Sequence, residues 1–165
     1  MAEGVFLHLS SQRGVATCFE VASAGTVGYQ AGTCPDPRAV RAAGRHGIDI
    51  SSIRAQSVDD LDLCGFDRVF TMDLENYHDV IELMRDCSGG QVHMMTDFAD
   101  TEEGLEIQDP YYGSEADFDK VMKQLLRSAE GILSAMQAEY KLAPAVAAES
   151  SPYGSGQGGA YGFAR

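Results

Sequence analysis

The residues from 114 onward carry the pattern that most constrains the fold of this chain. Apolar residues recur there at intervals of three and four, at Phe118, Val121, Met122, Leu125, Ala129, Ile132, Leu133 and Met136. This spacing places all of them on one face of an α-helix. Ser114 followed by Asp117 resembles a capping box with Asp in place of Glu. The sequence therefore predicts a long helix that begins after Ser114 and has one continuous apolar face.

Upstream of this helix, short apolar segments alternate with helical ones. Asp36 and Pro37 form a favourable helix start, with Asp36 as N-cap and Pro37 at the first helical position. Strands separated by helices form parallel sheets, so the predicted fold is α/β, a three-layer arrangement with a short parallel sheet flanked by helices. The predicted strands are 19–23, 68–72 and 91–95, and the predicted helices are 2–13, 37–46, 74–84 and 115–136.

Composition limits what the protein can bind. The 165 residues suffice for one domain, and 12 Lys and Arg against 25 Asp and Glu give a net charge of −13. This charge argues against binding to nucleic acids and to anionic membranes. No apolar run approaches the roughly 18 residues that span a bilayer, and the first residues lack the pattern of a signal peptide. We therefore expect a cytoplasmic protein with no membrane association.

The four cysteines and the end of the chain complete this description. Cys18, Cys34, Cys64 and Cys87 are scattered with no CxxC pair, which is typical of reduced thiols rather than of disulfides or a zinc site. Residues 144–165 consist mostly of Ala, Ser, Gly, Gln and Tyr and show no regular period. We expect residues 1–143 to form one domain and 144–165 to form a disordered tail. An interaction role for the Tyr- and Gly-containing tail is the alternative.

Three groups of residues together carry a family resemblance. They are Met1–Phe6, then Ser23–Thr26 with 35–40 and 45–49, and finally Asp109–Gly113. In this order and at these distances, they resemble the low-molecular-weight protein tyrosine phosphatases over roughly residues 1–140. The residues Phe66-Asp67 and Thr71-Met72-Asp73 also fit. The resemblance implies a four-stranded parallel sheet with helices on both faces, and hydrolysis of protein phosphotyrosine through a cysteinyl-phosphate intermediate.

The resemblance also assigns roles to individual residues. Asp109 matches the family's general acid, which protonates the leaving phenolate and then serves as base for the attacking water. Tyr111 and Tyr112 match the rim of the substrate pocket, and Tyr29 falls on its opposite wall. The simpler alternatives are a turn aspartate at 109, packing aromatics at 111 and 112, and an exposed loop tyrosine at 29. The implied substrate is a phosphotyrosine protein or a small aryl phosphate, and no metal or organic cofactor is implied.

The nucleophile of the family has no counterpart in this sequence. Family members carry a phosphate loop, C-x5-R-[ST], that follows the first strand and runs directly into the helix that begins here at Met1. Six residues after the four cysteines stand Ala24, Val40, Phe70 and His93, so no cysteine has the required arginine. We therefore expect a sequence truncated at its N-terminus, without the first strand, the nucleophile and the arginine, and inactive as written. The alternative is a non-catalytic pseudophosphatase that acts as an interaction or regulatory protein.

Overall fold

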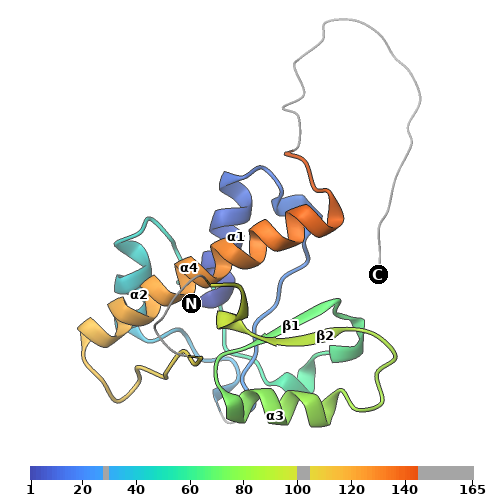
Figure 1. Cartoon of the computed structure of the whole chain (residues 1–165). Helices are drawn as coiled ribbons and strands as arrows, with labels where there is room; N and C mark the ends of the chain where they lie inside the picture. Colours follow the sequence, from blue (N-terminus) through green and yellow to red (C-terminus); the bar gives the residue numbers. More distant parts are fainter. Residues whose placement is uncertain (28–29, 100–104, 145–165) are drawn as a thin grey trace, which may run out of the picture.

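The computed structural model describes residues 1–27, 30–99 and 105–144 (Figure 1). Its α-helices are α1 (Ala2–Gln12), α2 (Pro37–Gly44), α3 (Leu74–Leu83) and α4 (Glu115–Tyr140). The strands β1 (Arg68–Thr71) and β2 (Gln91–Met94) form one parallel sheet, and several 3-10 turns connect the elements. All four predicted helices are confirmed, with boundaries that differ by a few residues. Tyr29 and nearly all of the predicted tail lie outside the described residues.

The core forms where α4 meets the other helices. The side chains of its apolar face are buried together with residues of α1, α2 and the short turn η5 (Met95–Phe98). In Figure 1, α1, α2 and α4 lie on one side of the two strands and α3 lies on the other. The structure thus confirms the predicted α/β class with a parallel sheet between helical layers. Its most deeply buried large side chains include Val5, Ile50, Met122, Ile132 and Leu133.

The two strands of the sheet are joined through α3. β1 and β2 pair in parallel from Arg68 opposite Gln91 to Thr71 opposite Met94. Asp73 stands two residues after the end of β1 and is the N-cap of α3, because its carboxylate accepts the backbone N–H of Asn76 at 2.7 Å. The predicted strands at 68–72 and 91–95 are therefore confirmed, each one residue shorter than expected.

The predicted strand at 19–23 is wrong. The turn η1 (Ala16–Cys18) precedes it, and Phe19 has extended backbone angles of −124° and 136°. Alternating apolar residues favour an extended backbone, but a strand also needs a neighbouring strand to which its backbone can bond. In the described part of the chain, the nearest pairing is one isolated parallel bridge between Gly25 and Ser57. The described sheet therefore has two strands rather than the three expected from the sequence.

The prediction that the cysteines are all reduced thiols is also wrong. Cys64 and Cys87 form a disulfide with their Cα atoms 5.2 Å apart, whereas Cys18 and Cys34 are free and exposed. Cys64 lies in the turn η4 (Leu63–Gly65) just before β1, and Cys87 lies between α3 and β2. The parallel alignment of the strands brings the segments before both of them to the same edge of the sheet. The spacing of the cysteines in the sequence does not reveal this.

Removal of this disulfide should destabilise the fold. It closes a loop whose ends are 23 positions apart, and a cross-link of that length is expected to add about 3 kcal/mol to the free energy of unfolding. The variant Cys64→Ser with Cys87→Ser should therefore unfold at lower urea concentration than the oxidised parent. The double variant Cys18→Ser with Cys34→Ser is the control and should not change. An unfolding midpoint that is insensitive to both the substitution and reductant would contradict the prediction.

A close approach between α4 and η5 generates a second prediction. A Cβ atom at Gly131 would overlap the carbonyl oxygen of Phe98, whereas a Cβ atom at Gly44, the last residue of α2, would meet nothing within 4 Å. Gly131→Ala should lower the free energy of unfolding by about 1–3 kcal/mol through overpacking. Gly44→Ala should raise it by up to about 1 kcal/mol, because alanine favours the helix. Thermal unfolding of both variants tests this, and shifts of the same sign would refute it.

Candidate active site

The segment that carries Asp109 is held at the carboxyl edge of the sheet. We call residues 105–113 the Asp109 loop. The backbone N–H of Ile107 donates to the carbonyl of Met72, directly after β1, at 2.8 Å. The Thr96 hydroxyl, just after β2, donates to the carbonyl of Leu105 at 2.6 Å. Both strands therefore fix the loop at their carboxyl ends, the edge where open parallel sheets bind ligands.

Within the loop, a tight turn orients the Asp109 carboxylate. The N–H of Tyr111 donates to Oδ1 of Asp109 at 2.9 Å, and the N–H of Gly113 donates to the carbonyl of Pro110 at 2.8 Å. Such a bond between an aspartate and the backbone two residues later is an Asx-turn. The Asp109 side chain is nevertheless exposed. The turn thus gives the carboxylate a defined direction and leaves it accessible to a ligand.

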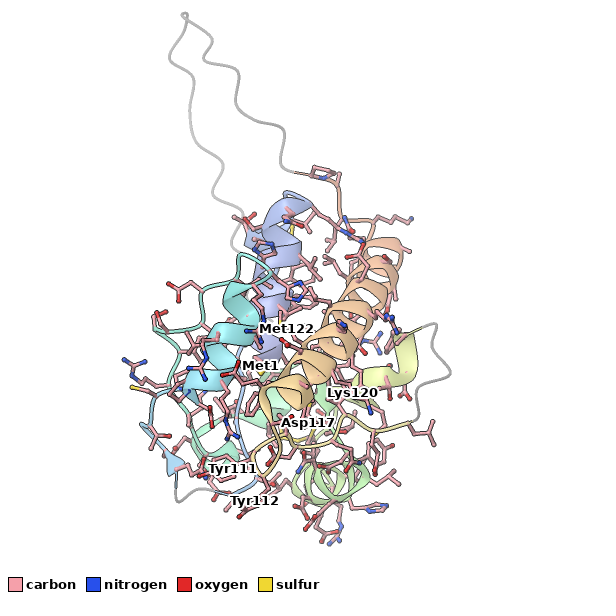
Figure 2. The ribbon with its side chains drawn as sticks, turned by 90° about the vertical axis from the view of Figure 1, so that its left-hand side faces the viewer. Met1, Tyr111, Tyr112, Asp117, Lys120 and Met122 are labelled. Atoms are coloured by element: carbon pink, nitrogen blue, oxygen red, sulfur yellow. A yellow bond between two sulfur atoms is a disulfide. The ribbon has the colours of Figure 1, made fainter. Side chains whose placement is uncertain are left out.

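Tyr111 and Tyr112 present aromatic surface next to this carboxylate. Their rings lie edge to face with centroids 5.1 Å apart. Tyr111 is half exposed, and Tyr112 is 97% exposed. Figure 2 shows both below the start of α4, away from the core. Exposed rings in this position are available to contact a planar ligand, because aromatic groups pack favourably face to edge or offset.

A cavity of about 270 Å³ lies between the Asp109 loop and the first turns of α4. Asp109, Asp117, Lys120 and Gln124 are among its lining residues, and Tyr111 and Tyr112 are not. Hydrogen bonds from the backbone N–H and hydroxyl of Ser114 lower the pKa of Asp117. Gln124 is 8% exposed, and its side chain has no hydrogen-bond partner in the described chain. The cavity therefore offers a carboxylate, an ammonium group and an amide to a polar ligand.

The start of α1 has backbone donors without a side-chain cap, although no residue of α1 lines the cavity. Met1 is the N-cap of α1, and no side chain accepts a hydrogen bond from the first backbone N–H groups of the helix. Burial lowers the pKa of the Met1 ammonium group, and Glu3 opposes this effect. The Ser23 hydroxyl donates to Glu3, and Asn76 at the start of α3 donates to the Thr26 hydroxyl at 3.4 Å. These contacts link the starts of α1 and α3, and helix starts attract anions.

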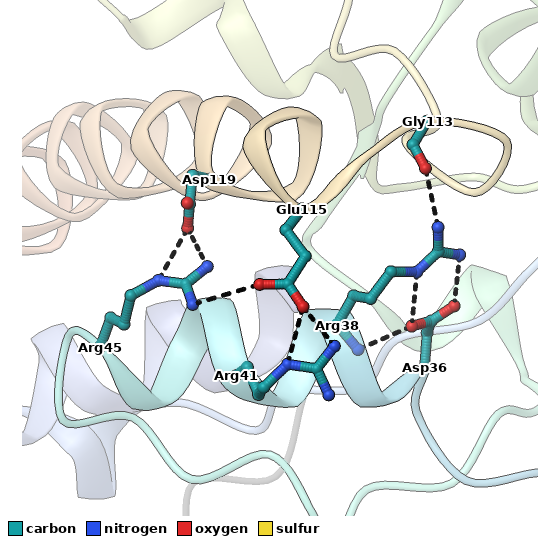
Figure 3. A network of polar contacts seen from close by, with 7 residues as sticks. All are labelled: Asp36, Arg38, Arg41, Arg45, Gly113, Glu115 and Asp119. Carbon is teal, nitrogen blue, oxygen red and sulfur yellow. Dashed lines mark hydrogen bonds and ion pairs between the residues drawn. The ribbon is translucent and has the colours of Figure 1, made fainter.

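Arg38 is a residue of this region to which the sequence assigned no role. It lies in the first turn of α2, and its guanidinium reaches the carbonyls of Tyr111 and Gly113 at 2.8 Å each. Figure 3 shows it beside Asp36, at one end of a row of contacts between α2 and α4. An aspartate and an arginine two positions apart at a helix start are visible in the sequence. The contact of Arg38 with a loop more than seventy positions away cannot be read from the sequence.

The four cysteines lie away from this site. None of the cysteines lines the cavity, and the disulfide lies at the amino edge of the sheet, opposite the Asp109 loop. Among the described residues, no three His, Cys, Asp or Glu side chains are grouped so that they could hold a metal ion. The helices of the described ranges also include none with the length and apolar character needed to cross a membrane.

Comparisons with known proteins show the family of this chain. The family model described as low molecular weight phosphotyrosine protein phosphatase matches residues 1–142. The protein of that name from Homo sapiens is 32% identical over 136 residues, which cover 81% of this chain and 84% of the human one. The Gallus gallus protein is also 32% identical with the same coverage.

Solved structures show the same relationship. The crystal structure of a protein tyrosine phosphatase from Entamoeba histolytica superposes with a TM-score of 0.74 at 28% identity. The match covers 86% of this chain and 89% of that structure. By the agreement of sequence, family model and fold, the chain belongs to the low molecular weight phosphotyrosine protein phosphatase family.

Proposed function

We propose that this chain carries the general acid and the aromatic pocket wall of a phosphotyrosine phosphatase site. The observation that carries the proposal is the position of Asp109, which is exposed, oriented by an Asx-turn and tied to the carboxyl ends of both strands. Tyr111 and Tyr112 lie beside it, and Tyr29 is the proposed opposite wall. Membership of the family supports the reaction class, and the residue roles are our assignment.

In the proposed reaction, Asp109 transfers protons and the tyrosines contact the aryl group of the substrate. The Asp109 carboxyl group donates its proton to the phenolic oxygen as the bond from phosphorus to oxygen breaks. It then accepts a proton from the water that hydrolyses the phosphoenzyme. Tyr111 and Tyr112 rest against the aryl group, which favours a phosphotyrosine protein or a small aryl phosphate as substrate. This chemistry uses no metal or organic cofactor.

In this proposal, none of the four cysteines of the chain supplies the attacking thiolate. No cysteine in the 165 residues is followed six positions later by arginine, and none of the four lines the cavity. We therefore propose that these 165 residues do not hydrolyse phosphate esters by themselves. A phosphate loop joined to Met1 would deliver the phosphate to the free N–H groups at the start of α1.

The lack of a cysteine in the cavity also favours a second candidate function. A pseudophosphatase would keep the Asp109 loop as part of an interaction or regulatory surface without turnover. For both functions we propose a cytoplasmic location. The phosphatase candidate should gain phosphatase activity when a nucleophile is supplied, and the pseudophosphatase should not.

A fusion protein separates these candidates. An apolar strand that ends in a C-x5-R-[ST]-P loop, joined directly to Met1, should convert the chain into an aryl phosphatase. In that fusion, Asp109→Asn should lower kcat/KM for phenyl phosphate by about 10²–10⁴-fold, because its leaving group needs a proton. The loss should be much smaller for 4-nitrophenyl phosphate. Asp86→Asn, at an exposed carboxylate between α3 and β2, is the control and should retain full activity.

The unfused chain is the second control for this experiment. The 165-residue chain should release no phosphate above the buffer blank. Release that Asp109→Asn abolishes would show that a nucleophile lies within these residues, and the proposal would fail. A fusion that unfolds cooperatively but has no activity would support the pseudophosphatase.

A further inference from the structure

We propose that Arg38 is a positioning residue for Asp109, which it orients through the backbone of Tyr111. The inference rests on the proposed function of Asp109 as the general acid. Arg38 lies on α2 and does not line the cavity, so it acts through the loop and not on the substrate.

The argument starts from two bonds made by one peptide segment. Arg38 Nη2 donates to the carbonyl of Tyr111 at 2.8 Å, and the N–H of the same Tyr111 donates to Asp109 Oδ1 at 2.9 Å. Arg38 Nη1 also donates to the carbonyl of Gly113 at 2.8 Å. One guanidinium therefore holds both ends of the segment 111–113, and the first residue of that segment holds the Asp109 carboxylate.

The other side of the guanidinium is fixed just as firmly. Arg38 Nε and Nη2 donate to the two carboxylate oxygens of Asp36 at 3.1 and 2.8 Å. Its Cζ atom lies 4.5 Å from the centroid of the buried Phe118 ring and 5.9 Å from that of Tyr111. Hydrogen bonding from Arg38 lowers the pKa of Asp36, so this carboxylate remains charged at neutral pH. The planar fork of arginine is needed to bond a carboxylate and two carbonyls at once.

Two neighbouring arginines, Arg41 in α2 and Arg45 at its C-cap, show by comparison what is particular to Arg38. Arg41 bonds Glu115 at 2.5 Å, and Arg45 bonds Asp119 (Figure 3). These two side chains are 52% and 44% exposed, against 27% for Arg38. Exposed ion pairs between side chains contribute little to stability. Among the contacts drawn in Figure 3, only the bond from Arg38 to the Gly113 carbonyl reaches the backbone of the Asp109 loop.

Hydrogen exchange of the full 165-residue chain tests the anchoring directly. In Arg38→Ala, the amides of Tyr111 and Gly113, which donate to Asp109 and Pro110, should exchange at least about tenfold faster, because two charge-assisted bonds to the loop are lost. Arg38→Lys should give a similar increase, since an ammonium group cannot span the same acceptors. Arg41→Ala is the matched control: it removes a contact between α2 and α4 and should leave these amides unchanged. Loop exchange at the parent rate in both Arg38 variants would overturn the proposal.

A kinetic measurement in the fusion protein separates positioning from general stability. Arg38→Lys should lower kcat/KM for phenyl phosphate by at least about tenfold and leave kcat/KM for 4-nitrophenyl phosphate nearly unaffected, as expected when only proton donation to the leaving group suffers. It should add little to the loss already caused by Asp109→Asn. Equal losses on both substrates would show a merely structural role and refute the inference. If Asp109→Asn itself has no effect, the proposed function fails, and this result is distinct from a failure of the Arg38 anchor.

Discussion

The burial of the apolar face of α4 is the interaction on which the rest of this structure depends. Large aliphatic and aromatic side chains each contribute about 1.5–3 kcal/mol when they are fully buried. Those of α4 are covered by α1, α2 and η5 together. At Gly131, the backbone of α4 approaches the Phe98 carbonyl so closely that no side chain fits between them. Because α4 begins directly after the Asp109 loop, its packing fixes where that loop must end.

Charge has a different role in this acidic protein. Most of the described arginines bond acidic partners, often on another element, as Arg13 does with Glu130 and Arg68 with Glu139. Each exposed pair adds little stability. These pairs instead fix how α4 lies against its neighbours, because α4 receives such contacts along much of its length. Near the start of α4, Arg38 pairs with Asp36 and also donates to two backbone carbonyls of the Asp109 loop.

The sequence predicts the local features of this fold and misses the non-local ones. Asp36, Asp73 and Ser114 mark helix starts because a cap acts within three residues. The apolar period of 118–136 reports a face of one helix and needs no knowledge of its partners. The strand predicted at 19–23 was wrong because a strand depends on a neighbour that local pattern does not show. The bond between Cys64 and Cys87 was missed for the same reason: it follows from the parallel pairing of β1 with β2.

The candidate site likewise contains residues that the sequence identifies and residues that only the structure reveals. Asp109, Tyr111 and Tyr112 stand together in the sequence, so one motif is enough to single them out, and the structure places Asp109 on the cavity and the tyrosines at its side. Arg38 and Gln124 come from two distant helices. A sequence pattern gives no reason to pair either of them with the loop, because their contact with this region arises from tertiary packing.

The disulfide makes the two edges of the sheet different. It joins the segments that precede the two strands, so the separation of their amino ends is set by covalent geometry. At the carboxyl ends of the strands, hydrogen bonds join Met72 and Thr96 to the Asp109 loop. The two strands are thus bridged at both edges of the sheet, by a covalent bond before them and by the loop that carries the carboxylate after them.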